Sequence, residues 1–371
     1  MPVANEFVPV TVLVEAPIIK DRVGIYFAGR GAFTDFLLPK LSPQLENVKT
    51  NFYEGVVKAF WRVNSKNTLT LMTYGSKDFF QTDLLSNLPN VIGSATFFDH
   101  KTLNYNAKWV YLINNNLDLV TSFTKANYDP IIGTIENVTK YKVKLNSGLD
   151  QNIYKSSLNY QKGDNKLETG LNFTQTQIRP GTLEPGKAAG VNFIQIPTEY
   201  SNEYGIFIDD EYEFTKKLAV TGGLRYSFFT ALGAGEVRTY DPTQARDEFS
   251  VTGSKTYAKG EIIKTYGGLE PRFGMRYLLS ESVSLKMGYN LMRQYLQIVS
   301  NTTTPIPTSR WKTSDANIKP QVSHLFTVGS YKSFEGNIFD MSLEGYYRRS
   351  NNIIDYKPGA DFLLQKFPET Q

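Results

Sequence analysis

The sequence predicts an all-β fold, an antiparallel up-and-down transmembrane β-barrel. Strand–turn–strand units recur about every 50 residues along the 371-residue chain, and short turns alternate with long loops, as they do in transmembrane barrels. The clearest strands also alternate apolar and polar residues over about ten positions, which is the length of a tilted strand that crosses a membrane. Both features run through the whole chain, so we expect residues 1–371 to form a single domain.

The units close with short polar turns. These turns lie at residues 18–21, 64–67, 114–116, 163–165, 215–217, 280–282 and 335–337. Seven two-stranded units amount to about fourteen strands, and short turns at one end with long loops at the other are typical of outer-membrane barrels, whose periplasmic turns are short and whose extracellular loops are long.

Composition excludes some classes of protein. The mean hydropathy of −0.32 and the hydrophobic fraction of 41% are too polar for a helical membrane protein, which needs stretches of about 18 or more apolar residues. They suit a membrane barrel or a soluble β protein, because only one face of a barrel strand must be apolar. The aromatic fraction of 13% fits the aromatic girdles of barrels, although β-sheets in general favour Phe and Tyr.

Charge and residue content exclude several kinds of binding site and catalytic site. The net charge of +4 comes from 40 basic and 36 acidic residues without a Lys/Arg run, so we expect no nucleic-acid partner. The absence of cysteine excludes disulfides and thiolate metal sites. Only two histidines occur, His100 and His324, and no catalytic or phosphate-binding motif is present. We therefore expect no enzyme activity, no metal site and no cofactor.

Residues 218–229 (LAVTGGLRYSFF) show the alternation that defines two strand faces. Leu224 and Tyr226 fall on one face, whereas Arg225 and Ser227 fall on the other. About ten residue steps at about 3.3 Å span about 33 Å, and a tilt of about 40° reduces this to about 25 Å, the height of the apolar band of an outer-membrane barrel. The same pattern recurs in residues 57–63, 283–290 and 339–348.

The cost of a misplaced charge decides which face meets lipid. An Arg or Lys on the lipid face at the bilayer centre costs about 2–4 kcal/mol. The charged residues of the alternating strands should therefore face the lumen, and they are Lys58, Arg62, Arg225, Lys286, Glu344 and Arg348. Residues 203–213 and 321–332 alternate too poorly for their faces to be assigned from the sequence.

The long loops hold the candidate ligand contacts. Residues 231–261 and 300–317 combine Arg and aromatic residues with polar ones, and binding residues concentrate on loops that a rigid scaffold positions. The candidates are Arg238, Tyr240, Asp241, Arg246, Arg310 and Trp311. An ordinary hydrophilic loop surface is the alternative for each of them.

Several segments resemble the barrel of TonB-dependent outer-membrane receptors. Residues 202–227 (NEYGIFIDDEYEFTKKLAVTGGLRYS) resemble a strand pair of that family in which Tyr and Asp-Glu precede a short turn and a G-L-R-Y strand. The other similar segments are residues 7–30, 269–277 (LEPRFGMRY), 282–301 and 318–329. The resemblance implies a location in the cell outer membrane and a barrel of about 22 strands with a plug domain in its lumen. It also implies capture of a small ligand at the cell surface and import when the TonB complex pulls on the plug.

The chain departs from that pattern at both ends. Residues 1–11 (MPVANEFVPVT) hold no signal peptide, and no TonB box or plug follows them. Residues 357–371 are loop-like and contain no closing strand. We therefore expect about fourteen of about 22 strands, in an open, curved sheet whose unpaired edges are costly in lipid. Such a piece alone is not expected to be an active transporter.

The leading functional hypothesis is TonB-energised uptake of a bulky, scarce nutrient. A siderophore, a cobalamin and a glycan fit equally well, because nothing in the loops distinguishes them. The alternatives are a passive porin and a structural barrel or surface adhesin without energy coupling. A phospholipid hydrolase would need a reactive serine near His324.

Leu224 and Arg225 test the assignment of the strand faces. Leu224→Arg would place a charge in lipid at a cost of about 2–4 kcal/mol, so we expect it to impair barrel assembly far more than Arg225→Leu does. The measurement is the folded fraction of each variant in membranes, read from the mobility of heated and unheated samples on gels. Equal losses from the two substitutions would contradict this register.

Overall fold

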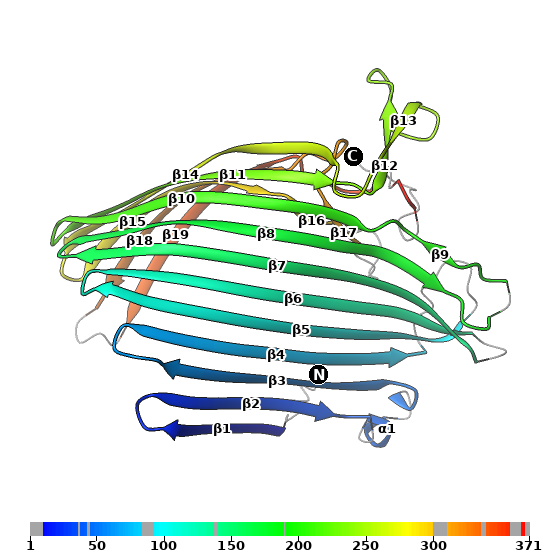
Figure 1. Ribbon diagram of the computed structural model, residues 1–371, viewed down its shortest axis with the longest axis horizontal. Helices are drawn as coiled ribbons and strands as arrows, with labels where there is room; N and C mark the ends of the chain where they lie inside the picture. The colour runs from blue at the N-terminus through cyan, green and yellow to red at the C-terminus, as the bar shows by residue number, and fades with distance from the viewer. Residues whose placement is uncertain are drawn as a thin grey trace.

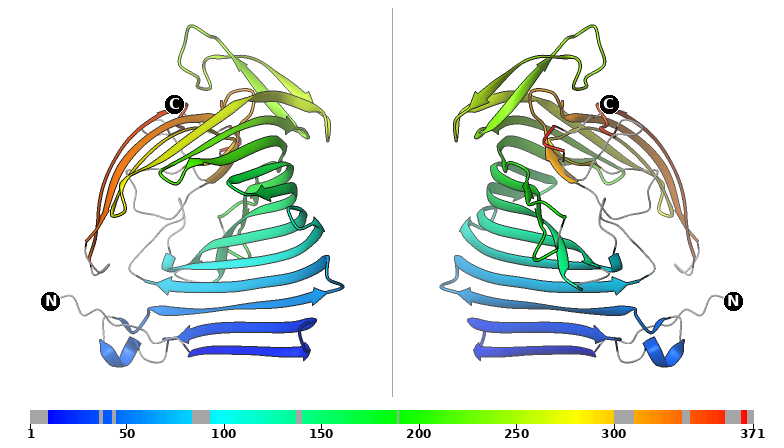
Figure 2. Two further views of the ribbon diagram at one scale, coloured as in Figure 1. Left: turned by 90° about the vertical axis from the view of Figure 1, so that its left-hand side faces the viewer. Right: turned by 90° about the vertical axis from the view of Figure 1, so that its right-hand side faces the viewer.

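One curved antiparallel sheet forms the wall of the protein (Figures 1 and 2). The computed structural model describes residues 10–35, 38–42, 45–83, 93–136, 140–188, 190–299, 310–334, 339–356 and 365–367. The strands of the wall are β1 (Val10–Ile19), β2 (Val23–Phe33), β3 (Lys49–Arg62), β4 (Asn67–Thr82), β5 (Gly93–Asn114), β6 (Leu117–Glu136), β7 (Lys142–Lys162), β8 (Asn165–Glu184), β10 (Glu199–Thr215), β11 (Leu218–Leu232), β14 (Ile262–Ser280), β15 (Val283–Gln294), β18 (Gln321–Ser333) and β19 (Asp340–Asn351).

Each strand of the wall pairs with its neighbours in chain order. The sheet runs β1-β2-β3-β4-β5-β6-β7-β8-β10-β11-β14-β15-β18-β19, which confirms the predicted up-and-down order and the predicted fourteen strands. Among the described strands, β1 and β19 each pair with a single neighbour and form the two edges of the sheet.

Smaller elements lie at the loop end of the wall. They are α1 (Leu38–Leu41), β9 (Ile194–Gln195), which pairs with β8, the hairpin of β12 (Gly235–Tyr240) and β13 (Val251–Tyr257), and the hairpin of β16 (Leu296–Val299) and β17 (Arg310–Thr313). The β12–β13 hairpin stands out from the wall near the C-terminal residues (Figure 1). Part of the region predicted as loop is therefore paired strand. The described part of the chain contains no helix that is long and apolar enough to cross a membrane.

Side-chain and glycine signals explain why the chain reverses at the short turns. Asn64 Oδ1 accepts hydrogen bonds from the backbone N–H groups of Lys66 and Asn67, both at 2.9 Å, and this local bonding favours a turn. Gly163 has a φ of 57°, a conformation that glycine adopts without strain. Six of the predicted turns lie between paired strands. The seventh, residues 335–337, lies outside the described residues.

The alternation predicted for β11 is present. Leu224 is 42% exposed on one face, which we call the outer face, whereas Ser227, three positions further along, is 0% exposed on the other, the inner face. The pairing also assigns the two segments whose faces the sequence left open. In β10, Glu203 lies on the inner face, because its carboxylate contacts Arg225 of β11 at 2.8 Å. In β18, Phe326 lies on the outer face, where its ring neighbours that of Tyr289 at 4.7 Å.

A row of aromatic rings crosses the outer face of five adjacent strands. Directly opposed residues of β6, β7, β8, β10 and β11 place successive ring centroids 4.7, 6.0, 4.9 and 6.1 Å apart. The row consists of Phe123, Tyr154, Phe173, Tyr204 and Phe228. Such a row is typical of the aromatic girdle at one interface of a membrane barrel.

The outer face changes from polar to apolar at this aromatic row. On the loop side, the next outer-face residues of the same strands are all polar: Lys125, Asn152, Gln175, Asn202 and Thr230. On the turn side, Leu171, Ile206 and Leu224 are exposed and apolar. Several strands continue well past the row, and β5 is 22 residues long, more than the predicted ten or so. Backbone pairing itself does not require an apolar face, so the strands extend further than their alternation indicates.

No large hydrophobic core supports the wall among the described residues. Two small clusters of buried apolar side chains lie at its loop end, one around Val143 and Leu183 and the other around Phe229 and Tyr295. The backbone ladder and cross-strand side-chain pairs therefore stabilise most of the sheet.

Phe173, at the centre of the aromatic row, tests the contribution of cross-strand pairs. Phe173→Leu removes two ring contacts, so we expect it to lower the free energy of unfolding by about 1–2 kcal/mol. Urea unfolding in lipid vesicles measures the change. Tyr226→Leu is the matched control, because Tyr226 is exposed on the same face and has no ring neighbour among the described aromatic pairs. Equal losses in both variants would show that the row contributes nothing specific.

Candidate functional site

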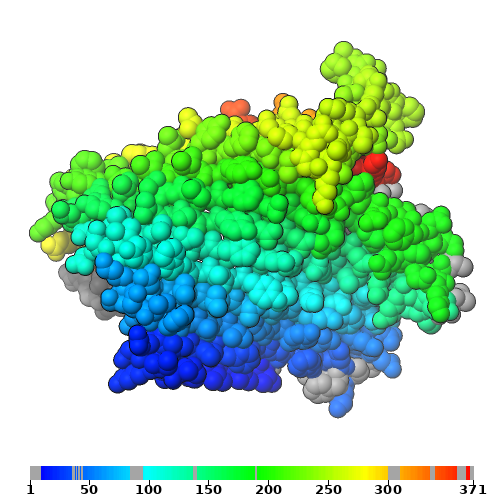
Figure 3. All heavy atoms as spheres, viewed as in Figure 1, coloured from blue at the N-terminus to red at the C-terminus, as the bar shows by residue number. Residues whose placement is uncertain are grey.

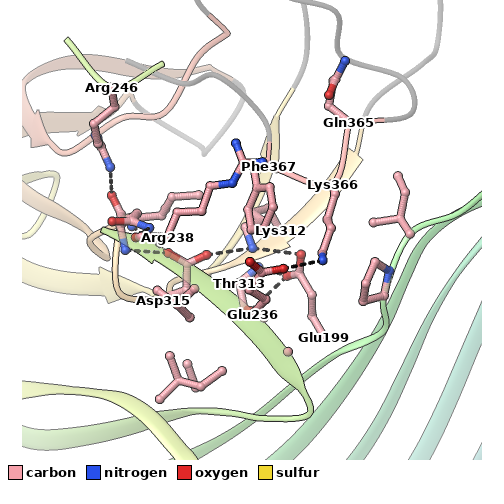
Figure 4. Close-up of a pocket in the computed structure, with 18 of the residues that line it drawn as sticks. Glu199, Glu236, Arg238, Arg246, Lys312, Thr313, Asp315, Gln365, Lys366 and Phe367 are labelled. Carbon is pink, nitrogen blue, oxygen red and sulfur yellow. Dashed lines mark hydrogen bonds and ion pairs between the residues drawn. The ribbon is translucent and has the colours of Figure 1, made fainter. Parts of the chain in front are cut away.

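A cavity of about 410 Å³ opens at the loop end of the wall. It is lined by residues 196–200, the loop ends of β11 and β14, the β12–β13 hairpin, β17 with the residues after it, and residues 365–367 (Figure 4). The space-filling view shows the β12–β13 hairpin rising from the surface on this side of the molecule (Figure 3). The site therefore lies where the predicted long loops gather.

A buried ion cluster forms one side of the cavity. Lys312 Nζ lies 2.8 Å from Glu199 Oε1 and 2.8 Å from Asp315 Oδ2, and Arg310 Nη2 lies 3.5 Å from Glu199 Oε1. The side chains of Arg310 and Lys312 are only 5% and 10% exposed. Burial by itself would lower the pKa of Lys312, but the attraction of Asp315 and Glu199 outweighs it and raises that pKa above its ordinary value. The ammonium is therefore charged at neutral pH.

Arg310 joins the β17 strand to the C-terminal residues. Its Nη1 donates a hydrogen bond to the carbonyl oxygen of Gln365 at 2.7 Å. Its Nε is buried and has no hydrogen-bond partner among the described residues. One guanidinium thus contacts two distant segments and keeps a donor unused.

The rim of the cavity carries a second group of charged and aromatic side chains. The Arg238 guanidinium lies 4.0 Å from the centre of the Phe367 ring, and Lys366 Nζ lies 2.7 Å from Glu236 Oε2. Arg246 donates a hydrogen bond to the carbonyl oxygen of Asn317. These contacts connect the β12–β13 region to β17 and to the C-terminal residues, as Figure 4 shows.

Partial burial raises the pKa of the Tyr240 phenol, which also lines the cavity, and the nearby charges of Arg238 and Arg246 oppose that rise. The two guanidinium groups and the phenol therefore share one region of the rim.

A hydrogen-bonded network anchors the β16–β17 hairpin to the wall. The Tyr295 hydroxyl lies 2.7 Å from Ser227 Oγ, which donates to Glu270 at 2.5 Å. The Tyr295 ring stacks on Phe229 with a centroid distance of 4.7 Å. Beyond β17, the Tyr266 hydroxyl donates to the Asp315 carbonyl oxygen at 2.7 Å. The wall thereby holds the hairpin that carries Arg310 and Lys312.

The structure brings four of the six candidate loop residues together. Arg238, Tyr240, Arg246 and Arg310 line the cavity. Asp241 does not line it, because its carboxylate accepts hydrogen bonds from the backbone N–H and hydroxyl of Thr243 and stabilises a turn of its own loop. Trp311 is absent from the lining too, and pairs with Ile298 of β16.

Sequence reasoning missed Glu199, Asp315 and residues 365–367 as parts of the site. Glu199 lies 113 residues from Lys312 along the chain, and no local pattern marks it. Residues 365–367 line the cavity, and they belong to residues 357–371, which the sequence predicts to be a loop-like end. Only the curvature of the sheet brings these segments together.

The six charged residues expected to face the lumen share the inner face. Arg225 contacts Glu203 and Glu270 there. Lys286 lies 4.4 Å from the centre of the Tyr331 ring, and Tyr331 hydrogen-bonds Glu344. Arg348 donates a hydrogen bond to Ser323 at 3.0 Å. Lys58 lies on the inner face because directly opposed residues, one on each strand from β3 to β10, connect it to Glu203, and directly opposed residues share a face. Arg62 lies four positions from Lys58 on β3 and therefore on the same face.

The two histidines lie in the wall rather than at the cavity. His100 meets the edge of Tyr128, and His324 Nδ1 lies 3.0 Å from the Tyr289 hydroxyl. Among the residues that the structure describes, no three His, Cys, Asp or Glu side chains gather as metal ligands would.

The fold and the sequence together define the class of protein. Residues 43–366 match the family described as TonB dependent receptor-like, beta-barrel. The match covers most of the chain, which therefore belongs to this family of outer-membrane receptor barrels. No curated protein sequence matches the chain.

Solved structures with this fold come from the same class. The copper transporter OprC shares 12% identity, with 93% of this chain and 52% of that one covered and a TM-score of 0.65. The alcaligin outer-membrane receptor FauA from Bordetella pertussis shares 12% identity over 98% of this chain and 52% of its own, with a TM-score of 0.60. The hemophore receptor HasR from Serratia marcescens shares 13% over 93% and 52%, with a TM-score of 0.61. The chain thus spans about half the length of these proteins.

Lys312 tests whether the buried ion cluster holds the site together. Lys312→Met would leave the Glu199 and Asp315 carboxylates buried without their ammonium, and breaking a buried pair costs about 3–5 kcal/mol. We expect the amides of β17 to lose hydrogen-exchange protection. Lys255→Met is the matched control, because Lys255 is exposed and lies 3.9 Å from Glu261. Equal exchange in both variants would contradict a structural role for the cluster.

The pH dependence of the same protection follows from the raised pKa of Lys312. A raised pKa means that the stabilisation is complete below the ordinary lysine value and is lost as the pH rises through the higher folded-state value. In the wild-type protein, the contribution of Lys312 to the hydrogen-exchange protection of the β17 amides should therefore stay constant from about pH 6 to about pH 9.

Proposed function

We propose that the protein is an outer-membrane receptor that imports a bulky, scarce nutrient with energy from the TonB complex. The observation that carries the proposal is the cavity at the loop end of a wall of this family, which several distant segments of the chain build together. Solved structures of the same fold are described as a copper transporter, a ferric-catecholate import receptor and a receptor in complex with its hemophore and heme. Those descriptions support uptake of a scarce solute from outside the cell.

The proposal assigns the inner face to the lumen and the outer face to lipid. The outer face offers exposed apolar and aromatic side chains, as a lipid-facing band does. The inner face carries cross-strand ion pairs, such as Arg272 with Asp209 at 2.9 Å and Arg276 with Glu213 at 3.3 Å. A wall of this polarity suits a folded, water-soluble plug domain in the lumen. The plug, the TonB complex and the imported ligand are therefore the proposed partners.

The proposed function requires no catalysis. The family consists of receptors and transporters, and the cavity can be explained without the chemistry of an enzyme. Side chains that bind and orient a ligand are sufficient for capture, because the energy for release comes from the TonB complex.

Uptake by living cells tests the proposed function. A strain without the gene is grown under limitation for iron, copper, cobalamin or a glycan in turn. We expect a growth defect under one of these conditions, restored by the gene and not restored in cells that lack TonB. Uptake that persists without TonB would identify a passive porin. Surface binding of a macromolecule with no uptake of any nutrient would identify an adhesin.

A further inference from the structure

We propose that the cavity recognises an oxyanion group of its ligand, a carboxylate or a phosphate, through Arg238 on the β12–β13 hairpin and Arg310 on β17. This inference rests on the proposed function, because it names the chemical class of ligand that the same cavity takes. The charges around the cavity support the inference, because several acidic side chains already have cationic partners, whereas Arg238 and Arg310 keep N–H donors for a ligand.

Three carboxylates around the cavity already have cationic partners. Glu199 and Asp315 share the Lys312 ammonium, which lies 2.8 Å from each, and Glu199 also has the Arg310 guanidinium at 3.5 Å. Glu236 has the Lys366 ammonium at 2.7 Å. A carboxylate held this closely by an ammonium presents little negative charge to a ligand. These acids therefore neither attract a cation strongly nor repel an anion strongly.

Arg238 retains donors that a ligand can use. Its Cζ lies 4.0 Å from the centre of the Phe367 ring, and a guanidinium carries five N–H donors, more than this contact uses. Arg238 also hydrogen-bonds the Tyr240 side chain, and its charge acts on Glu236. The Glu248 carboxylate lies 3.8 Å away, which is too long for a hydrogen bond, and the Glu248 side chain is 73% exposed. An ion pair this open contributes little, so a ligand oxyanion can replace Glu248.

Arg310 supplies a second, buried donor. It lines the cavity, its side chain is 5% exposed, and its Nε has no hydrogen-bond partner among the described residues. A buried donor without an acceptor is unfavourable, so an oxygen acceptor in the cavity would stabilise the site. Arg310 offers this one donor, because its Nη1 is bonded to the Gln365 carbonyl oxygen and its Nη2 lies 3.5 Å from Glu199.

Equilibrium binding to the full-length protein in detergent micelles tests the inference. Isothermal titration calorimetry uses citrate and inorganic phosphate as separate anionic probes and spermidine as a cationic probe, all at the same ionic strength. We expect at least one anion to bind and spermidine not to bind. Citrate alone would indicate a carboxylate ligand, and phosphate alone a phosphate ligand.

Three variants identify the residue responsible. Arg238→Gln should weaken binding of the anion at least about tenfold, and Arg238→Lys should recover only part of it, because the charge returns without the fork. Glu248→Gln removes the competing carboxylate and should tighten binding about two- to fivefold. The tightening keeps the test valid even if an Arg238 variant folds poorly, since a merely structural role for Arg238 would not produce it.

Arg276→Gln is the matched control, because Arg276 lies on the inner face of the wall and contacts Glu213 at 3.3 Å, away from the cavity. Anion binding should be unchanged in this variant. Failure of both anions to bind, preference for spermidine, or an equal effect of Arg276→Gln would overturn the inference. If TonB-dependent uptake accompanied any of those results, the proposed function would still stand. Anion binding through Arg238 without TonB-dependent uptake would support the inference and overturn the proposed function.

Discussion

The wall depends on one constraint, the need to pair every backbone N–H and C=O group inside a membrane. Lipid offers no hydrogen-bond partner, so each strand must satisfy its backbone through its neighbours. Between its edge strands β1 and β19, the described wall meets this demand with a continuous antiparallel ladder in which each strand pairs with the next in chain order. The long registers of β5, β6, β7 and β8 are the clearest result, because they pair residue by residue for about twenty positions. A hydrophobic core of the usual kind is not required for such a sheet.

The same ladder separates two environments with one layer of backbone. Because side chains alternate across a strand, the aromatic row of Tyr154, Phe173 and Tyr204 can cover the outer face while charged residues occupy the inner face. On the inner face, charges lie opposite partners on neighbouring strands, as Arg225 lies 2.8 Å from Glu203. Polarity thus follows from register, and a shift by one residue would exchange the two faces.

The cavity lies at the loop end of the wall, where paired strands hold its lining residues in place. Tyr295 connects the β16–β17 hairpin to Ser227 and Phe229 of β11, so the hairpin begins from a fixed point. From there Lys312 reaches Glu199, which belongs to a segment far away in the chain. The ion cluster and the anchoring network together position Arg310 beside the rim that carries Arg238. Membership in a family of receptor barrels gives this arrangement its context.

The sequence alone determines the order of the strands, the short turns and the alternation of β11, because each of these depends on residues that are neighbours in the chain. Asn64 hydrogen-bonds the backbone of its own turn. Leu224 and Arg225 are consecutive residues and therefore lie on opposite faces of their strand. Four of the six candidate contacts could also be named, since Arg and Tyr in long loops are a local signal. The pairing of Glu199 with Lys312, the departure of Asp241 and Trp311 from the site, and the contribution of Phe367 could not. Those contacts join segments that are distant in sequence, and only the curvature and register of the folded sheet decide which of them meet.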